Sequence, residues 1–355
     1  MKIAFLAYLQ GFGGAEKQII MLANAMAKRG HKVLLASVVE ENCCYEIDPG
    51  VLHDALTKSE ISFLRVLTRY GKIKKELKSF EPDVTVNFWY QSAYLTALMS
   101  KGITGKVIYS ERGDPGDKEY KGLLGMVRKL TLPRMDGFVF QSNGAARYFD
   151  KSVRKRSTVI PNPVTVRPYR ELALEKRRKV IVSVGRLHPQ KNHKLLIDAF
   201  MRIESLAPEY SLEIYGDGEL KEEIQRYVDV NNAEKKIVLK GTSDHVHDLI
   251  YDASIFVLSS DYEGMPNALL EAMALGIPCI STDYRPGGVR EIIKNNVNGM
   301  IVPAGNAQRL ADGMLEIISN PDLAERLSKN AIESSRAYAP ERIYNAWENA
   351  ISFNS

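Results

Sequence analysis

Two carboxylates eight positions apart, Glu263 and Glu271, stand in residues 259–274 (SSDYEGMPNALLEAMA). Glu263 follows an apolar run, and Pro266-Asn267 marks the start of a helix whose first turns contain Glu271. Extended reach and helical rise then separate the carboxylates by about 10 to 15 Å. Each can accept hydrogen bonds from vicinal hydroxyls while the helix N-terminus between them supports phosphates, a span that suits one sugar nucleotide. A capping glutamate and a surface glutamate are the alternative.

Two cations precede these carboxylates in residues 183–192 (SVGRLHPQKN), directly after a predicted strand. Arg186 can grip two oxygens in a planar fork and Lys191 acts as a mobile point charge, so both can stabilise negative charge growing on a leaving phosphate. Two surface cations in a loop remain the alternative. We expect His188 and His193 to be loop and helix-surface residues rather than ligands.

A glycine-rich loop, residues 11–16 (GFGGAE), follows the first predicted strand and opens a helix. Glycines there let backbone N–H groups approach an anion at the positive helix end. With Glu40 further on, the loop partly matches a dinucleotide fingerprint. The carboxylate of Glu16 stands where that fingerprint has glycine or alanine, and it would repel a pyrophosphate. NAD binding is therefore disfavoured, and a plain tight turn stays open.

The elements that must position these residues alternate along the whole chain. Apolar runs and amphipathic stretches follow one another, which predicts parallel sheets with crossover helices. In the first helix Ile19, Leu22, Ala23 and Met26 recur at three- and four-residue spacing, so they form one buried stripe. The predicted strands are residues 2–7, 32–39, 83–88, 106–110, 137–141 and 157–160 in a first series, and 179–184, 211–216, 236–240, 255–259, 278–282 and 300–302 in a second.

Length and composition agree with two domains. A chain of 355 residues exceeds what one core supports, and 45% hydrophobic with 26% charged residues excludes disordered, collagenous and coiled-coil classes. The alternation breaks at residues 161–164 (PNPV), where we expect the linker. Two doubly wound, Rossmann-like domains should face each other, with a ligand in the cleft at the carboxyl ends of their strands.

Charge is unevenly distributed between the two halves. Residues 1–165 hold 25 Lys and Arg against 16 Asp and Glu, whereas the remaining 190 residues hold 23 against 27. Such an excess attracts anionic surfaces such as membranes, although a solvated helix face would look the same. The N-terminus has only a short apolar stretch, which favours a buried strand over a secretion signal. The basic clusters are Arg65, Arg69, Lys72, Lys74, Lys75 and Lys78, and Lys151, Arg154, Lys155 and Arg156.

Over nearly its whole length the chain resembles glycosyltransferase family 4, the retaining nucleotide-sugar enzymes of the GT-B fold. The resemblance rests on Gly13-Gly14-Ala15-Glu16, Val184-Gly185-Arg186 with Lys191, Tyr215-Gly216-Asp217-Gly218, and Glu263 with Glu271. It implies that Glu263 contacts donor-sugar hydroxyls, Glu271 the ribose, and Arg186 with Lys191 the diphosphate. The implied catalytic residues are Arg186, Lys191 and Glu263. The implied donor-binding residues are Gly13, Gly14, Gly185, Val246, Met265, Pro266, Asn267, Ala268, Leu269 and Glu271.

The resemblance also bears on the domains and the acceptor site. The last helix, residues 340–351, would return to the first domain, giving domains of 1–164 plus about 340–355 and of 165–339. Arg342, Tyr344 and Trp347 in that helix are then packing and surface residues. Many relatives carry a histidine after the fourth strand, whereas this chain has Glu111 and Arg112, our candidates for acceptor or donor-sugar contacts. A turn stabilised by an ion pair is equally compatible.

The implied activity is that of a retaining hexosyltransferase. It would move a hexose or N-acetylhexosamine from a nucleoside diphosphate sugar, a UDP-sugar by preference, to a hydroxyl of a growing, lipid-linked glycan in surface polysaccharide assembly. We expect no cofactor and no essential metal, because cationic side chains can take the metal's role and the chain has no Asp-x-Asp pair with a supporting helix. The enzyme should be cytoplasmic and peripheral on the inner face of the plasma membrane, held by its basic first domain.

Three other functions fit part of the pattern. A GT-B sugar-nucleotide epimerase would use the same donor but needs acid-base residues beside the sugar C2. A non-catalytic nucleotide-sugar-binding subunit would neither hydrolyse nor transfer the donor. Nucleic-acid binding fits the basic clusters, but Trp89, Tyr90 and Tyr94 are not arranged with them as a stacking platform.

Overall fold

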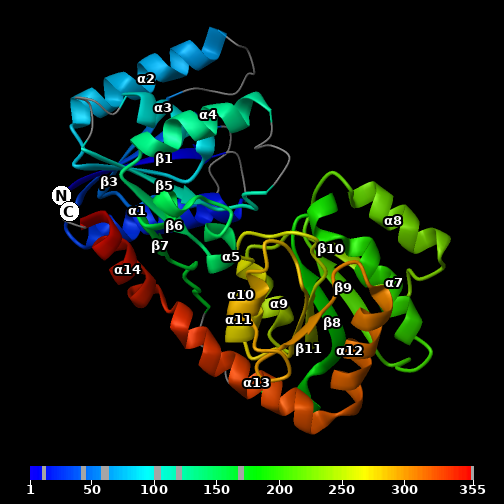
Figure 1. The fold of residues 1–355 in the computed structure, drawn as a ribbon. Coiled ribbons are helices and arrows are strands. Elements are labelled where there is room, and N and C mark those ends of the chain that lie inside the picture. The colour runs from blue at the N-terminus through cyan, green and yellow to red at the C-terminus, as the bar shows by residue number, and fades with distance from the viewer. Residues whose placement is uncertain are drawn as a thin grey trace. The chain divides into compact units, whose positions relative to one another are not determined.

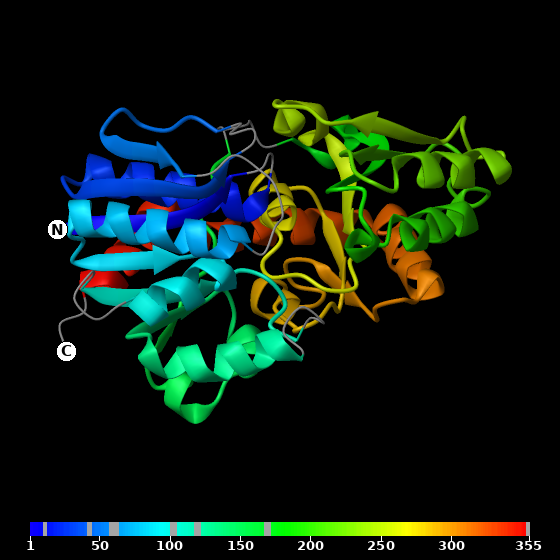
Figure 2. The same cartoon turned by 90° about the horizontal axis from the view of Figure 1, so that it is seen from above.

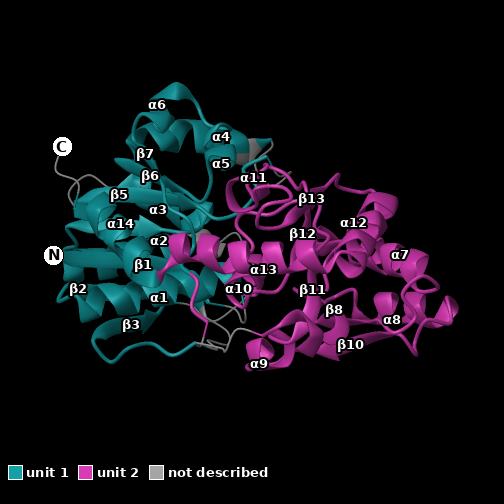
Figure 3. Cartoon of the chain, turned by 90° about the horizontal axis from the view of Figure 1, so that it is seen from below, with its two compact units in different colours: residues 1–163, 340–355 teal, residues 164–339 magenta. Residues whose placement is uncertain are grey.

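The computed structural model describes residues 1–9, 13–40, 45–56, 64–99, 105–116, 122–166 and 172–352, with the backbone alone at 64–68 and 123–124. The chain divides into two compact units, residues 1–163 with 340–355 and residues 164–339 (Figure 3). The boundaries expected from the sequence differ from these by one residue. Among the described residues, no helix is long and apolar enough to cross a bilayer.

Unit 1 is built on a parallel sheet of seven strands in the order β3-β2-β1-β4-β5-β6-β7. Its strands are β1 (Lys2–Leu9), β2 (Lys32–Glu40), β3 (Val51–Ala55), β4 (Val84–Asn87), β5 (Lys106–Glu111), β6 (Gly137–Phe140) and β7 (Ser157–Val159). Its helices are α1 (Gly14–Lys28), α2 (Leu64–Phe80), α3 (Tyr90–Met99), α4 (Leu123–Thr131), α5 (Asn143–Ala146), α6 (Lys151–Arg154) and α14 (Pro340–Ser352), with a 3-10 turn η2 (Leu132–Arg134).

Helices cover both faces of this sheet. Figure 1 shows α1 and α14 on one face and α2, α3 and α4 on the other, and Figure 2 shows the second face from above. The predicted stripe of α1 is confirmed, because Ile19, Leu22, Ala23 and Met26 are all at most 2% exposed. The sheet is therefore apolar on both sides, as a parallel sheet with crossover helices requires.

The edge strand β3 was missed by the sequence pattern. Only Val51 of its five residues is buried, and Leu52 is 60% exposed. A strand with one buried side chain lacks the apolar run by which strands are recognised in a sequence. It is held in the sheet by backbone hydrogen bonds to β2, which leave no sequence pattern.

The helix α14 is anchored on α1. Arg29 follows α1 and donates from Nη1 to Glu348 at 2.7 Å and from Nη2 to Glu341 at 2.7 Å. Trp347 is 2% exposed and stacks on Phe88, with ring centroids 5.7 Å apart. The last helix thus contributes an aromatic core residue to the sheet of the first unit, and Tyr344 packs while Arg342 faces solvent.

Unit 2 has a parallel sheet of six strands in the order β10-β9-β8-β11-β12-β13. Its strands are β8 (Arg178–Val184), β9 (Ser211–Tyr215), β10 (Ile237–Gly241), β11 (Ala253–Leu258), β12 (Cys279–Thr282) and β13 (Met300–Val302). Its helices are α7 (His193–Ile203), α8 (Lys221–Val230), α9 (Val246–Ile250), α10 (Asn267–Ala274), α11 (Val289–Ile292), α12 (Ala307–Ser319) and α13 (Pro321–Ser335), with 3-10 turns η3 (Leu174–Lys176), η4 (Pro189–Lys191) and η5 (Arg336–Tyr338).

The strand order brings candidate residues of unit 2 together at the carboxyl ends of its central strands. In Figure 1, α7, α8 and α12 lie on one side of the strands and α9, α10 and α11 on the other. The central strands β8 and β11 are neighbours and parallel, so the loops that follow them leave the sheet side by side. These two loops carry the predicted cations and the first predicted carboxylate.

Candidate functional site

The loop after β8 turns sharply beside the loop after β9. The N–H of Gly185 donates to the carbonyl of Tyr215 at 2.9 Å. Gly216 has φ +146°, and a Cβ built there would lie 1.9 Å from the carbonyl oxygen of Gly185. Only glycine allows the two backbones to come this close. The turn therefore exposes Arg186 at the end of β8, and its guanidinium has no hydrogen bond or ion pair with any described residue.

Lys191 and Glu263 form an ion pair between the two central loops. The Nζ–Oε1 distance is 2.5 Å, and the side chains are 16% and 7% exposed. Lys191 runs past Gly185, since a Cβ there would lie 3.1 Å from its Cε. The structure thus brings together Gly185, Lys191 and Glu263, with Arg186 adjoining them in the chain.

The carboxylate of Glu263 accepts three hydrogen bonds. Lys191 and the hydroxyl of Ser260 donate to Oε1, the latter at 2.6 Å, and Nε2 of Gln190 donates to Oε2 at 3.1 Å. A carboxylate has about four acceptor positions, so these contacts occupy most of its capacity and leave Oε2 with room for one more donor. Glu263 is thereby held in one orientation with a single acceptor position for a ligand hydroxyl.

The same two loops are joined by further hydrogen bonds. Asn192 donates from Nδ2 to Asp261 at 3.0 Å, the N–H of Asp261 donates to the carbonyl of Gln190 at 2.9 Å, and the hydroxyl of Ser259 donates to the carbonyl of Lys191 at 2.8 Å. These bonds fix the register between the loops. Gln190, Ser260 and the loop register were not predicted, because they depend on which atoms face each other across two loops.

The helix α10 begins at Asn267, three residues after Gly264. Pro266 stands at its start, no side chain caps it, and the first helical bond runs from the N–H of Leu270 to the carbonyl of Pro266 at 3.3 Å. The N–H groups of the preceding turn lie ahead of that bond. Met265, Pro266 and Leu269 are buried and Asn267 and Ala268 half-buried, so the segment presents little side-chain surface at the start of α10.

Glu271 lies on α10 and meets a residue that was not predicted. Its Oε2 is 3.2 Å from Nε2 of His247, which belongs to α9. Val246 begins α9 and packs half-buried against an apolar cluster. The sequence pointed to Val246 but gave no sign that the next residue pairs with Glu271.

His193 corrects an expectation. It is 3% exposed rather than on the helix surface, and neither ring nitrogen has a hydrogen-bond partner among the residues that the structure describes. Burial, aided by the charge of Lys191, lowers the pKa of His193 to about 4, while the nearby backbone of Gly185 and Arg186 opposes the shift without reaching hydrogen-bond geometry. His193 is therefore a neutral, buried ring near the base of the site. His188 stays in its loop, where Nδ1 accepts from the N–H of Gln190 at 3.2 Å.

The candidates in unit 1 form a separate cluster at the end of β5. Glu111 is 2% exposed, and its carboxylate accepts from the hydroxyl of Tyr109 at 2.7 Å and from the N–H of Gly113 at 3.1 Å. Arg112 donates to Asn162 at 2.9 Å and lies 4.1 Å from the ring centroid of Phe88. Burial lowers the pKa of Arg112 to about 9, against the attraction of Glu111. Both side chains are engaged inside unit 1.

The start of α1 in unit 1 holds its own carboxylate. Gly13 is the N-cap of the helix and Gly14 its first residue, and a Cβ on Gly13 would lie 2.9 Å from Oε1 of Glu16. A negative side chain therefore stands beside the helix N-terminus, which disfavours a closely bound pyrophosphate there. Residues 11 and 12 of the predicted loop lie outside the described residues.

A cavity of about 680 Å³ lies at the opposite, amino ends of the unit 2 strands. Arg177, Tyr210 and Ser254 line it, together with residues of α12 and α13. None of the predicted site residues does. Its position at the wrong end of the strands separates it from the chemistry described above. No cluster of three or more potential metal ligands occurs among the described residues.

Comparisons with known proteins identify the family and the fold. Residues 12–167 match the family model described as Glycosyltransferase Family 4, and residues 169–334 match that of Glycosyl transferases group 1. A GalNAc-alpha-(1->4)-GalNAc-alpha-(1->3)-diNAcBac-PP-undecaprenol alpha-1,4-N-acetyl-D-galactosaminyltransferase of Campylobacter jejuni is 24% identical over 361 residues, which cover 99% of this chain and 98% of that protein. A UDP-Gal:alpha-D-GlcNAc-diphosphoundecaprenol alpha-1,3-galactosyltransferase of Escherichia coli is 29% identical over 187 residues, covering 49% and 48%.

Among solved structures, Anabaena HepE in complex with UDP and glucose matches with a TM-score of 0.82 and 18% identity, covering 100% of both chains. The likeness confirms the GT-B fold predicted from the sequence. The two family models together match most of the chain, one in each unit. The chain therefore belongs to glycosyltransferase family 4 and is an enzyme of the hexosyltransferase type.

Proposed function

We propose that this enzyme moves a hexose or N-acetylhexosamine from a UDP-sugar to a hydroxyl of a lipid-linked glycan during surface polysaccharide assembly, with retention of anomeric configuration. The observation that carries the proposal is the ion pair of Lys191 and Glu263, together with the exposed guanidinium of Arg186, which follows Gly185 in the same loop as Lys191. It combines cations for a diphosphate with an oriented carboxylate for a sugar hydroxyl.

The cations address the leaving group. As the bond between the anomeric carbon and its oxygen breaks, the electron pair goes to the departing diphosphate, and nearby positive charge stabilises it. The guanidinium of Arg186 has no competing partner among the described residues. The ammonium of Lys191 donates to Glu263, so a diphosphate would compete with this carboxylate for it. The backbone amides that start α10 add dipoles of the same sign. This charge distribution supports reaction without a metal.

Glu263 orients the sugar. Its Oε1 is taken by Lys191 and Ser260, so a donor hydroxyl would bind at Oε2, next to Gln190. Retention follows if the acceptor approaches from the side of the leaving phosphate, which then takes the acceptor's proton. The described loops place no second carboxylate in contact with Glu263 that would act as a separate base.

The donor and acceptor classes draw on the relatives. Anabaena HepE binds UDP and glucose, and the Campylobacter and Escherichia coli enzymes act on undecaprenol-linked diphospho-sugars. With a lipid-linked acceptor, the enzyme would work at the inner face of the plasma membrane. Membrane association is also supported by α2, where Lys72, Lys75 and Lys78 are exposed. The side chain of Arg65 lies outside those described.

The helix α4 lies on the same face of the unit 1 sheet as α2 and adds apolar surface there (Figure 2). Met126 is 59% and Leu130 66% exposed, one turn apart, with the exposed Lys129 between them in the sequence. Exposed apolar side chains next to basic ones fit the interface of an anionic bilayer. Unit 1 would thus bind the membrane that carries the acceptor.

The test is a panel of nucleotide sugars with the purified full-length enzyme. UDP-glucose, UDP-galactose and their N-acetylated forms are incubated with undecaprenyl diphosphate-linked sugars, and transfer is followed by mass spectrometry of the lipid product. We expect one UDP-sugar to be transferred with the anomeric configuration kept, as read by NMR of the product. Interconversion of the donor without transfer would instead make the enzyme an epimerase, and binding without turnover a non-catalytic subunit.

A further inference from the structure

Glu271 does not stand alone on α10, because His247 of α9 contacts its carboxylate. The Nε2–Oε2 distance is 3.2 Å, and the side chains of His247 and Glu271 are 21% and 13% exposed. Nε2 of His247 is the atom that faces the carboxylate, and the contact is an ion pair when the imidazole is protonated. This contact leaves Oε1 of Glu271 as the oxygen not facing His247.

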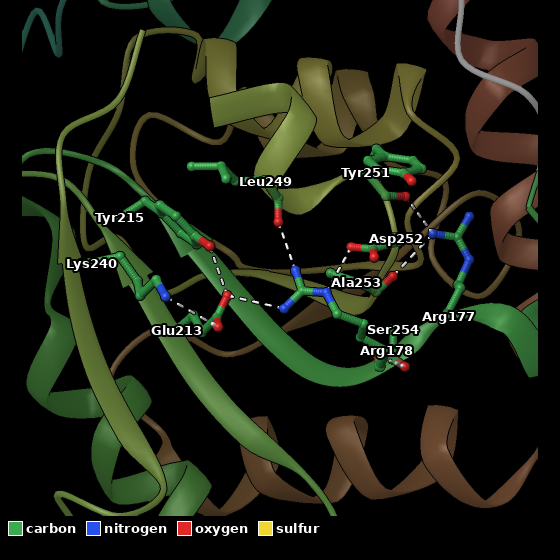
Figure 4. Close-up of polar contacts among 10 residues, drawn as sticks. All are labelled: Arg177, Arg178, Glu213, Tyr215, Lys240, Leu249, Tyr251, Asp252, Ala253 and Ser254. Carbon is green, nitrogen blue, oxygen red and sulfur yellow. Dashed lines mark hydrogen bonds and ion pairs between the residues drawn. The ribbon is translucent and has the colours of Figure 1, made fainter. Parts of the chain in front are cut away.

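The end of α9 is fixed by Arg178, the first residue of β8. Figure 4 shows its guanidinium between the end of α9 and the strand β9. On the α9 side, Nη2 donates to the carbonyl of Leu249 at 2.6 Å, and Nε donates to Asp252 at 2.9 Å. On its other side Arg178 approaches Glu213 of β9 at 3.5 Å. The short helix that carries His247 is therefore attached to the central sheet by a charged side chain.

The preceding residue, Arg177, connects α9 with α10. It is 7% exposed and donates from Nη1 to the carbonyl of Tyr251, just past α9, at 3.0 Å (Figure 4). Its Nη2 donates to the carbonyl of Gly276, just past α10, at 2.7 Å. One guanidinium thus bonds to the backbone at the carboxyl ends of both α9, which carries His247, and α10, which carries Glu271.

We propose that His247 is a positioning residue for nucleotide recognition: it holds the carboxylate of Glu271 in the rotamer that accepts hydrogen bonds from the vicinal ribose hydroxyls of the donor. The inference rests on the proposed donor site. A glutamate that is already oriented loses less rotamer freedom when the ligand binds, so the imidazole adds affinity without touching the ligand. Arg177 and Arg178 keep the two helices at the spacing that the contact needs.

The test measures the binding of UDP and of 2′,3′-dideoxy-UDP by calorimetry, with wild type and His247→Ala. Loss of the contact that holds Glu271 should weaken UDP binding about fivefold, on the scale of one hydrogen bond. The dideoxy nucleotide, which lacks both hydroxyls, should bind wild type and variant equally. His247→Gln, whose amide can donate in place of Nε2, should recover most of the UDP affinity. His245→Ala is the matched control. This histidine lies two residues before His247 and its side chain is 71% exposed, so its loss should change the affinity for neither nucleotide.

Equal weakening of both nucleotides, or no weakening of either, would overturn the role of His247. Glu271→Gln distinguishes this failure from failure of the proposed donor site: if it too leaves the difference between UDP and dideoxy-UDP unchanged, the ribose is not bound there. If UDP does not bind wild type, the same pairs are measured with ADP and GDP, and absence of binding by all three would overturn the donor site and the inference together. Thermal midpoints within about 2 °C of wild type exclude a general loss of structure.

Discussion

Lys191 and Glu263 lie 72 positions apart in the chain, yet the Nζ of one is 2.5 Å from the Oε1 of the other. The contact forms because β8 and β11 are adjacent and parallel, so that the loops after them emerge together. In the unliganded protein each charge neutralises the other. A donor diphosphate would compete for the ammonium, while the carboxylate is kept in place by Ser260 and Gln190.

Breaking this pair on one side should destabilise the protein. Lys191→Met leaves Glu263 buried with its charge unmatched, and we expect a loss of about 2 to 4 kcal/mol in the free energy of unfolding. Glu263→Gln should cost a similar amount through the unmatched ammonium. The double variant should recover at least half of either loss, since no buried charge remains. Urea denaturation measures all three, and strictly additive losses would contradict the coupling.

His193 predicts a pH dependence of stability. Its pKa of about 4 in the folded protein lies below the unfolded value of 6.5, so between these values the unfolded chain binds more protons. Stability from this residue is complete above about pH 6.5 and is lost as the pH falls towards 4, by no more than about 3 kcal/mol. Urea midpoints at pH 7.5 and 4.5 measure the difference.

The control for this prediction is His193→Asn, which removes the titrating group. Its stability should fall less than that of wild type over the same pH interval, and His245→Ala, at an exposed site, should behave as wild type does. An unchanged pH dependence in the His193 variant would contradict the assignment.

The basic face of α2 should govern membrane binding. Ile73 and Leu77 of this helix are fully buried, and Lys72, Lys75 and Lys78 are exposed, so changing the three lysines keeps the core side chains and removes only the bond from Lys72 to the carbonyl of Leu56. Charge reversal of the three lysines to glutamate should weaken binding to vesicles containing 30% anionic lipid by at least about tenfold, since each basic residue contributes roughly 1 kcal/mol at such a surface.

Salt should have the same effect, because screening shortens the reach of these charges. Reversal of Lys221 and Lys235 on unit 2 is the control and should leave vesicle sedimentation unchanged. If the triple variant sediments with anionic vesicles as wild type does, this face is not the membrane-binding surface.

Activity should not need a divalent ion. The exposed Arg186 and the nearby Lys191 supply the positive charge that a metal would otherwise bring to the diphosphate. Initial rates with 10 mM EDTA should stay within about a factor of two of those with Mg²⁺, whereas loss of activity that Mg²⁺ or Mn²⁺ restores would assign the charge stabilisation to a bound ion.

Much of this could be predicted from sequence because local periodicity determines it. The apolar stripe of α1, the strands β8 and β11, and the helix that begins after Pro266 follow from patterns a few residues long. Glu263 and Glu271 were found because their spacing combines a loop with a helix turn.

The remainder depends on contacts between distant segments. That Gln190 and Ser260 donate to Glu263 follows from the register of two loops, and that His247 meets Glu271 from the packing of α9 beside α10. In the sequence His193 looks like a surface histidine in the first turn of a helix. In the structure the turn at Gly185 and Arg186 lies against its ring, which is buried. The engagement of Arg112 with Asn162 and Phe88 likewise depends on the segments that follow β5, β7 and β4 meeting at one end of the sheet, which no short pattern records.

The most direct test of the account is the turnover of Arg186→Ala at saturating donor. Because this guanidinium is exposed and makes no bond with described residues, its loss should leave the thermal midpoint unchanged. Removing positive charge from the leaving group should lower kcat about 100-fold or more, and Arg186→Lys should restore part of it. A variant that turns over saturating UDP-sugar as fast as wild type would contradict the central claim.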